Sequence, residues 1–101
     1  MPEVKALVVV QIVVNDWDGY RQYGSAPHQE IFDKFGAKVV GIDEDVDVVE
    51  GSWPFTRTVI LEFPSKELAR AWYASDEYQA VVGLRHGSAT SNLVIVSGYP
   101  G

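Results

Sequence analysis

The apolar positions of residues 5–14 fall on both sides of a predicted β-strand. The run is rich in β-branched side chains and has the length of a strand. A strand that is apolar on both faces is normally covered on both faces. We therefore expect helices over one face of the sheet and a second cover over the other. The first face holds Ala6, Val8, Val10, Ile12 and Val14, and the second holds Leu7, Val9 and Val13.

A helical pattern follows this strand. Asn15 and Asp16 carry side chains that can cap a helix, and apolar and aromatic residues recur at mainly helical spacing over residues 17–35. Gly24 and Pro27 interrupt the pattern, which predicts a kink or two helical pieces. Gly36 is placed where a C-terminal glycine ends a helix.

The remaining pattern predicts three strands and a second helical region. Ser65 and Ser75 are expected to cap two helical segments, with Gly87 as the stop. The acidic turn at residues 43–45 leads into residues 46–50, which are a possible extension of the second strand. The expected strands cover residues 37–42, 57–63 and 92–97, and the expected helical segments cover residues 66–74 and 75–86.

The element order is strand, helix, strand, strand, helix, strand. This βαββαβ order predicts an α+β fold of ferredoxin-like type, with a four-stranded antiparallel sheet and helices on one face. The 101 residues fit a single domain, 1–101. The uncovered apolar face predicts a homodimer through the sheet face, in which two sheets close into a dimeric α+β barrel.

Composition narrows the classes of partner. The net charge is −6, with eight basic and fourteen acidic residues, which argues against nucleic acid and anionic membrane surfaces. The chain has no cysteine, so it forms no disulfide. The N-terminus has no signal-peptide pattern, and the longest apolar run falls far short of the roughly 20 residues of a membrane span. We expect an unprocessed, cytoplasmic protein.

One set of residues carries a family resemblance. Glu62-Phe63-Pro64-Ser65 is followed by Ala71-Trp72-Tyr73, Ser75 and Glu77-Tyr78-Gln79, and the segment Val8–Gln11 agrees as well. This pattern resembles the DUF1330 family over essentially the whole chain. The resemblance implies a dimeric α+β barrel and little about activity. Other proteins of that fold include cofactor-independent monooxygenases, muconolactone isomerases and haem-binding chlorite dismutases, but shared fold alone transfers no chemistry.

No familiar catalytic or metal-binding motif is present. The two histidines, His28 and His86, lie far apart, and no HxH, HxxxH or HExxH spacing exists. The spacing of Asp43, Asp45 and Asp47 imitates the start of a calcium loop, but the later positions do not fit. We expect no metal and no cofactor. His86 is expected at a helix C-terminus, whereas His28 is a candidate base, with an exposed surface position as the alternative.

Polar residues inside the strands are the other candidates. A carboxylate on an apolar strand face is unfavourable unless it is paired or protonated. Glu62 is therefore expected at a strand end with water nearby or as a partner of Arg57 or Arg85, with a ligand-binding or acid–base role as the alternative. The aromatic set is expected to fill the core or an interface, or to line a pocket. The candidate ligand-binding residues are Tyr20, Tyr23, Trp53, Arg57, Trp72 and Arg85, and the candidate catalytic residues are His28 and Glu62.

Three functional hypotheses remain open at this point. The first is a dimeric domain that binds a small organic molecule in a cleft between sheet and helices. The second is a cofactor-independent isomerase or monooxygenase that acts on an aromatic or enol-type substrate, with a base in reach of it. The third is a subunit whose only task is its dimer surface, which predicts no cavity larger than a few water molecules.

Overall fold

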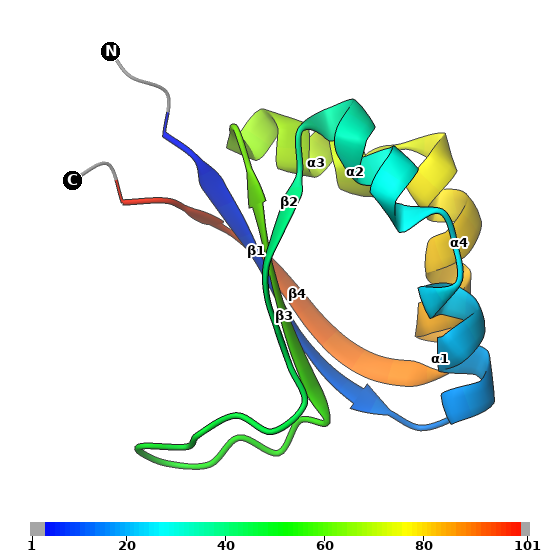
Figure 1. The fold of residues 1–101 in the computed structure, drawn as a ribbon, viewed down its shortest axis with the longest axis vertical. Coiled ribbons are helices and arrows are strands. Elements are labelled where there is room, and N and C mark those ends of the chain that lie inside the picture. Colours follow the sequence, from blue (N-terminus) through cyan, green and yellow to red (C-terminus); the bar gives the residue numbers. More distant parts are fainter. Residues whose placement is uncertain (1–3, 100–101) are drawn as a thin grey trace.

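A computed structural model describes residues 4–99, which form one sheet and four helices (Figure 1). The predicted βαββαβ order is confirmed, with each helical region divided into two helices. The elements are β1 (Ala6–Val14), α1 (Trp17–Gly24), α2 (His28–Phe35), β2 (Lys38–Asp43), β3 (Arg57–Phe63), α3 (Lys66–Ala74), α4 (Asp76–His86) and β4 (Ala89–Ser97).

The four strands form an antiparallel sheet in the order β2-β3-β1-β4. In the register, Val8 of β1 lies opposite Leu61 of β3 and Ile95 of β4. Alternate residues of β1 are buried, as the two-faced pattern predicted, because side chains along a strand point to opposite faces. The buried set is Ala6, Val8, Val10 and Ile12.

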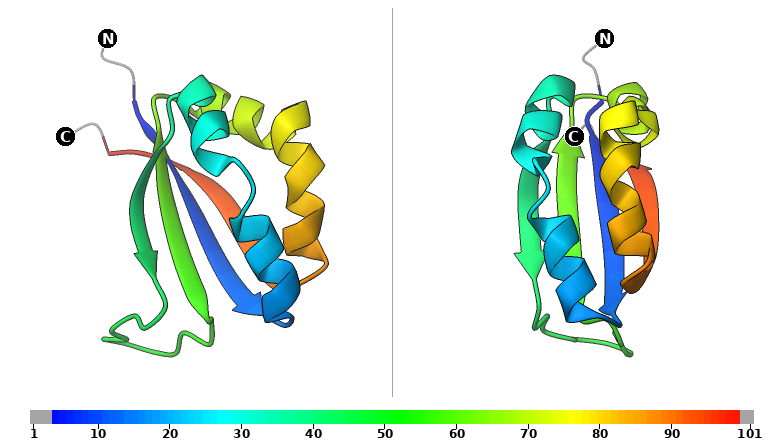
Figure 2. Two further views of the ribbon diagram at one scale, coloured as in Figure 1. Left: turned by 45° about the vertical axis from the view of Figure 1, so that its right-hand side comes forward. Right: turned by 90° about the vertical axis from the view of Figure 1, so that its right-hand side faces the viewer.

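All four helices lie on one face of the sheet (Figures 1 and 2). Helices α3 and α4 pack on the strands, whereas α1 packs on α4 and α2 packs on α3. The first helix pair is therefore supported mainly by the second pair rather than by the sheet. None of the helices within residues 4–99 is both long enough and apolar enough to cross a bilayer.

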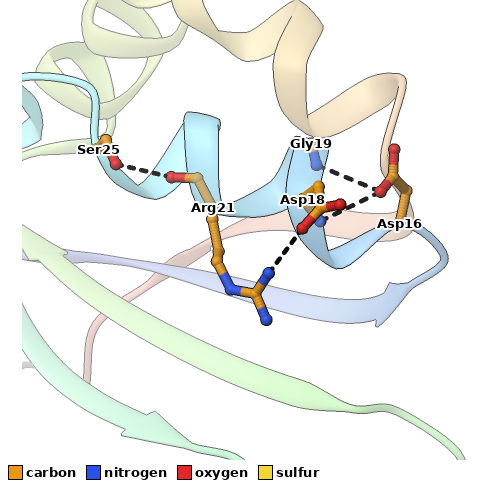
Figure 3. A network of polar contacts seen from close by, with 5 residues as sticks. All are labelled: Asp16, Asp18, Gly19, Arg21 and Ser25. Atoms are coloured by element: carbon orange, nitrogen blue, oxygen red, sulfur yellow. Dashed lines mark hydrogen bonds and ion pairs between the residues drawn. The ribbon is translucent and has the colours of Figure 1, made fainter.

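Helix caps fix where the helices begin. The Asp16 carboxylate accepts hydrogen bonds from the backbone N–H groups of Asp18 and Gly19 at 3.1 and 3.3 Å (Figure 3). The same figure shows Arg21 paired with Asp18 and the Ser25 hydroxyl donating to the Arg21 carbonyl. These bonds satisfy donors and acceptors that a helix end leaves free.

The predicted serine caps are also confirmed. Ser65 accepts from the backbone N–H of Leu68, and Ser75 accepts from that of Tyr78. Ser75 also donates its hydroxyl hydrogen to the Trp72 carbonyl, so it joins α3 to α4. The corner between these helices is therefore held by the Ser75 hydroxyl together with the hydrogen bond from the Ser75 backbone N–H to the Trp72 carbonyl.

The bounds of β1 and β2 differ from the prediction by one residue at most, and two strand predictions differ by more. β4 begins at Ala89, three residues earlier than expected, because residues 89–91 pair in register with the end of β1. Residues 46–50 do not extend β2. The Asp43 carboxylate accepts from the Asp45 backbone N–H at 2.8 Å, which turns the chain away from the sheet. The following connection to β3 extends away from the helices (Figures 1 and 2).

The second face of the sheet carries no helix. Val94 and Val96 on this face are 53% and 43% exposed, and Leu7, Val9 and Ile60 are half-buried beside them. The same face becomes polar further along the strands, where Asn92 donates to Gln11. We call this surface the open face. Its apolar end is formed by Leu7, Val9, Ile60, Val94 and Val96.

Candidate functional site

A cleft of about 260 Å³ lies between the covered face of the sheet and the helices. All four helices and the strands β1, β2 and β3 contribute to its walls. This volume exceeds that of a few water molecules, so it argues against the hypothesis of a purely structural subunit. Its apolar wall is formed by Val10, Ile12, Phe32, Val39, Ile42, Val59, Leu61 and Trp72, and its polar or amphipathic side chains are Tyr20, Tyr23, His28, Arg57, Tyr78 and Arg85.

The strand β2 leaves one side of the cleft open. Val39 and Ile42 point toward the helices but remain 45% and 51% exposed, because α1 and α2 do not pack on this edge strand. Small-molecule sites are typically concave and mostly apolar, with a few convergent polar groups. The arrangement of the cleft matches that description.

Arg85 anchors a polar network on the inner wall. It is only 3% exposed, and its Nη1 donates to the Tyr78 hydroxyl at 3.2 Å. The hydroxyls of Tyr78 and Tyr23 lie 2.7 Å apart in a second hydrogen bond. The guanidinium carbon of Arg85 also lies 5.8 Å from the centre of the Tyr23 ring. This geometry holds the cation by neutral groups alone.

Burial raises the pKa values of two tyrosines that line the cleft, Tyr78 and Tyr20. Desolvation raises the pKa of Tyr78 far above its usual range, because an ionised phenolate loses its hydration inside the protein. Arg85 lowers the pKa of Tyr78, but by less than burial raises it. Burial likewise raises the pKa of Tyr20, against the smaller lowering effect of Arg57. Both tyrosines therefore keep their hydroxyl hydrogens at neutral pH and can donate them.

Arg57 enters the cleft from the start of β3. Its Nη1 lies 2.6 Å from a carboxylate oxygen of Glu44, and its guanidinium carbon lies 5.8 Å from the centre of the Tyr20 ring. Glu44 belongs to the connection after β2 and is more than half exposed. Arg57, the second cation of the cleft, is therefore paired with a carboxylate of the same chain, and that carboxylate is accessible to solvent.

His28 is the first residue of α2 and lies half-buried at the wall of the cleft. Its Nε2 is 2.7 Å from the backbone carbonyl of Tyr23. A carbonyl can only accept, so Nε2 donates the hydrogen. In the neutral ring the other nitrogen, Nδ1, then carries a lone pair. The position differs from the open surface site given as the alternative.

Glu62 lies outside the cleft. Strand alternation directs it to the open face, beside Leu7 of β1, and its carboxylate lies 3.1 Å from Nζ of Lys5. The expected pairing with Arg57 or Arg85 is therefore wrong, because both arginines are on the other side of the sheet. The structure does not bring Glu62 and His28 together.

Trp53 also lies apart from the other candidates. Its indole N–H donates to the Thr58 hydroxyl at 2.9 Å, and its ring packs against Phe55. Thr58 faces the open side of the sheet, opposite Gln11. The structure thus gathers five of the six ligand-binding candidates, Tyr20, Tyr23, Arg57, Trp72 and Arg85, in one cleft.

Sequence reasoning did not include Tyr78 among the ligand-binding candidates. This residue is fully buried and links Tyr23 to Arg85. A signal was available, because Tyr78 and Arg85 are seven residues apart and so share one face of a helix. The wall residues of β2 gave no comparable signal, since their role depends on the helices leaving that strand uncovered.

A second, wider groove of about 850 Å³ runs outside α3 and α4 along β4. Arg70, Arg85 and His86 are among the residues that border it. His86 is the exposed last residue of α4, which agrees with its expected place at a helix C-terminus. Within residues 4–99, no three His, Asp or Glu side chains gather closely enough to hold a metal ion.

Comparison with known proteins identifies a family for nearly the whole chain. The family model described as "Domain of unknown function (DUF1330)" matches residues 5–99. No curated protein matches the chain in sequence.

Three solved structures illustrate the fold. The protein RPA0582 of unknown function from Rhodopseudomonas palustris is 18% identical, with a TM-score of 0.78 over 98% of this chain and 85% of that one. SnoaB, a cofactor-independent oxygenase from Streptomyces nogalater, is 9% identical, with a TM-score of 0.62 over 97% and 96%. A dimeric protein of unknown function with a ferredoxin-like fold, from Bacteroides fragilis, is 10% identical, with a TM-score of 0.60 over 92% and 95%. These likenesses confirm the ferredoxin-like α+β fold.

Proposed function

The chain belongs to the DUF1330 family, and on that premise we propose that it is a binding protein for a small organic molecule. The ligand site is the cleft between the sheet and the helices. The observation that carries this proposal is a preformed apolar cavity in which two arginines and three tyrosines converge. Aromatic and apolar walls of this kind favour flat, largely apolar ligands.

Titration with a bicyclic aromatic probe tests the site. We expect 1-naphthol to bind the wild-type protein, as measured by calorimetry and by shifts in the amide NMR signals of cleft residues. Val59→Phe places a larger side chain in the cavity and should abolish binding. Val49→Phe makes the same change on an 89% exposed side chain of the β2–β3 connection and should leave binding unchanged. Equal binding by both variants would place the ligand elsewhere.

The alternative function is enzymatic, and His28 is the observation that favours it. With Nε2 donating to a carbonyl, Nδ1 is the nitrogen available to take a proton from a bound molecule. In an isomerase, His28 would take a proton from a carbon beside a carbonyl and return it at another position, while an arginine stabilises the enolate. This exchange needs no cofactor. The likeness to SnoaB is a reason to test oxygen consumption as well.

Phenylpyruvate is a suitable probe for that alternative, because it is aromatic and enolises. In heavy water, an active protein should speed the exchange of its benzylic protons, and His28→Gln should remove the acceleration. Oxygen uptake with 1,4-dihydroxynaphthalene tests the monooxygenase branch. No acceleration of either reaction over buffer would count against enzymatic activity with this substrate class and leave the binding function in place.

The assembly that we propose is a homodimer through the open face. Val94 and Val96 are largely exposed there, and the half-buried side chains beside them continue the apolar surface. A second copy is the natural cover, because the two faces would be alike and apolar surface of this kind is rarely left open. Sedimentation equilibrium should give twice the chain mass of 11.2 kDa. A monomer at micromolar concentration would contradict this assembly.

A further inference from the structure

Three buried side-chain N–H groups within residues 4–99 have no hydrogen-bond acceptor. They are Nε of Arg57, Nε1 of Trp72 and Nε of Arg85, and all three residues line the same cleft. A buried donor without an acceptor is unfavourable, so native proteins rarely leave one unpaired. Because all three groups are donors, the partner that the cleft lacks is an acceptor.

The charge of Arg85 indicates what kind of acceptor is missing from the cleft. The side chain is nine-tenths or more buried, yet its contacts are the Tyr78 hydroxyl and the Tyr23 ring, which are neutral. Among the residues that the structure describes, 4–99, no Asp or Glu lines the cleft. A buried guanidinium without an anion is destabilising, because its hydration is lost and not replaced. The missing acceptor is therefore best supplied by a negative charge.

Arg57, the other cation of the cleft, differs from Arg85 because it has a carboxylate partner. Glu44 reaches it from the β2–β3 connection and neutralises it, although its Nε remains unpaired. Glu44 itself is not part of the cleft wall. The cleft thus carries two guanidinium groups, one already paired from outside and one, Arg85, without any carboxylate.

We propose that the ligand of the cleft is an organic carboxylate, held by Arg85 with its apolar body against Trp72 and Val59. This inference rests on the proposed binding function. The free Nε lies on the guanidinium edge that it shares with Nη2, and that edge binds a carboxylate through two parallel hydrogen bonds. Since Nη1 already donates to Tyr78, the orientation of the guanidinium is fixed before the ligand enters.

The test compares a carboxylate with its neutral amide. 1-Naphthoate and 1-naphthamide share one ring system, so a difference in their affinity reports on the charge. We expect the wild-type protein to bind naphthoate roughly ten- to a hundredfold more tightly, the range for a hydrogen bond to a charged group. Arg85→Met should remove this preference while the amide still binds. Arg70→Met, an exposed arginine outside the cleft, should retain it.

The outcomes separate the two proposals. Equal affinity for acid and amide would overturn the carboxylate inference and leave the cleft as a binding site. Failure of both probes and of 1-naphthol to bind would overturn the binding function together with the inference. Loss of the preference in Arg70→Met, with Arg85→Met unaffected, would place the anion in the outer groove and would also overturn it.

Stability distinguishes a ligand-holding role of Arg85 from a structural one. Without ligand, Arg85→Met should unfold at a temperature at least as high as wild type, because an apolar side chain replaces an uncompensated buried charge. A large fall in this temperature, combined with an unchanged preference for naphthoate, would assign Arg85 a structural role and overturn the proposal. If Arg85→Met does not fold, Arg85→Lys keeps the charge but loses the planar edge and should reduce the preference severalfold.

Discussion

The hydroxyl of Tyr78 connects three parts of the cleft wall. It meets Tyr23 from α1 and Arg85 from its own helix, while its ring stacks at 4.2 Å on Trp72 of α3. The Tyr78 hydroxyl accepts from Arg85 and shares a second hydrogen bond with the Tyr23 hydroxyl, in which either oxygen can be the donor as long as both phenols are protonated. The protonation of one side chain therefore supports the geometry of the cleft.

This dependence predicts a loss of stability at alkaline pH. The unfolded chain releases the Tyr78 proton near the ordinary pKa of 10.0, whereas burial raises the pKa in the folded state, so the folded state binds more protons above that pH. The contribution of Tyr78 to the free energy of unfolding is therefore complete below about pH 10. Above that pH the free energy of unfolding falls, by at most about 1.4 kcal/mol per pH unit for each such group. Tyr20 adds to the fall, since its pKa is raised too. Urea unfolding between pH 7 and 11.5 measures this slope.

Matched phenylalanine variants separate Tyr78 from the other tyrosines. Tyr78→Phe should lower the free energy of unfolding at pH 7 by about 1–3 kcal/mol, because two hydrogen bonds are lost. Its alkaline fall should be shallower than that of wild type. Tyr99→Phe, at a 94% exposed position, should change neither quantity. An identical alkaline slope in Tyr78→Phe and wild type would contradict the assigned cause.

Individual site residues were predictable where the chain itself showed a conflict. Arg57 was a candidate because it shares a strand face with apolar residues, and Arg85 because it is a cation that could pair with Glu62; both line the cleft. Glu62 was likewise a charged residue on an apolar strand face. The alternation of side chains does not show which face of the sheet the helices cover, so the sequence did not place Glu62 inside or outside the cleft. Its partner, Lys5, lies on the neighbouring strand β1, a pairing that only the sheet register shows.

At the scale of elements, local chemistry predicted most boundaries. β3 and α3 have the expected bounds, because Pro64 and the Ser65 cap separate them sharply. Gly36 ends α2 in the left-handed conformation expected of a C-terminal glycine, with φ of 74°. The start of β4 was not predictable from its serine and threonine residues, since it depends on pairing with the distant β1.

The Gly36 turn leads to a stability prediction. Gly36→Ala places a side chain at positive φ, and its Cβ would lie 2.9 Å from Cγ of Pro64. Strain and contact together should lower the free energy of unfolding by about 1–3 kcal/mol, measured by urea unfolding. Gly83→Ala is the matched control, because α4 there leaves open space, and it should raise stability by up to about 1 kcal/mol. A neutral Gly36→Ala would contradict the constraint at this turn.

The β2–β3 connection controls one of the two cationic groups. Glu44 holds Arg57 through an ion pair in which the Glu44 side chain is more than half exposed, and a pair screened by solvent in this way is worth about 0.2–1 kcal/mol. Glu44→Gln should therefore free Arg57 and tighten 1-naphthoate binding by about two- to fivefold in calorimetry. The neutral 1-naphthamide should bind as before.

A second charge in the same connection provides the control. Asp47→Asn removes one negative charge without breaking the pair with Arg57, so naphthoate affinity should stay close to that of wild type. An equal gain in Asp47→Asn and Glu44→Gln would show that net charge, rather than release of Arg57, governs binding. Higher salt should then reduce both gains alike.

At the scale of the whole molecule, the shape supports the proposed homodimer. The Cα extents are 44 × 37 × 16 Å, and the radius of gyration of 14.1 Å exceeds the roughly 13 Å of an average domain of this length. A flat layer of this size buries a smaller share of its apolar surface than a rounder one. The hydrophobic core gathers on the covered face, so the open face is where further burial is possible.

Dimer formation through the open face would make stability depend on concentration. The thermal midpoint of the wild-type protein should rise with protein concentration, since association favours the folded chain by mass action. Val94→Glu introduces a charge where Val94 pairs with Val9 and should give a monomer in sedimentation velocity, with a lower midpoint that no longer depends on concentration. Val49→Glu, on the exposed connection, should behave as wild type.

The two faces of the sheet are expected to act independently. Val94 and the cleft residue Val10 belong to neighbouring strands but to opposite faces, so a change at the interface alters no side chain of the ligand site. Monomeric Val94→Glu should therefore still prefer 1-naphthoate to 1-naphthamide at temperatures below its midpoint. A loss of that preference in a folded monomer would mean that the partner subunit shapes the cleft. The site would then belong to the dimer and not to the single chain.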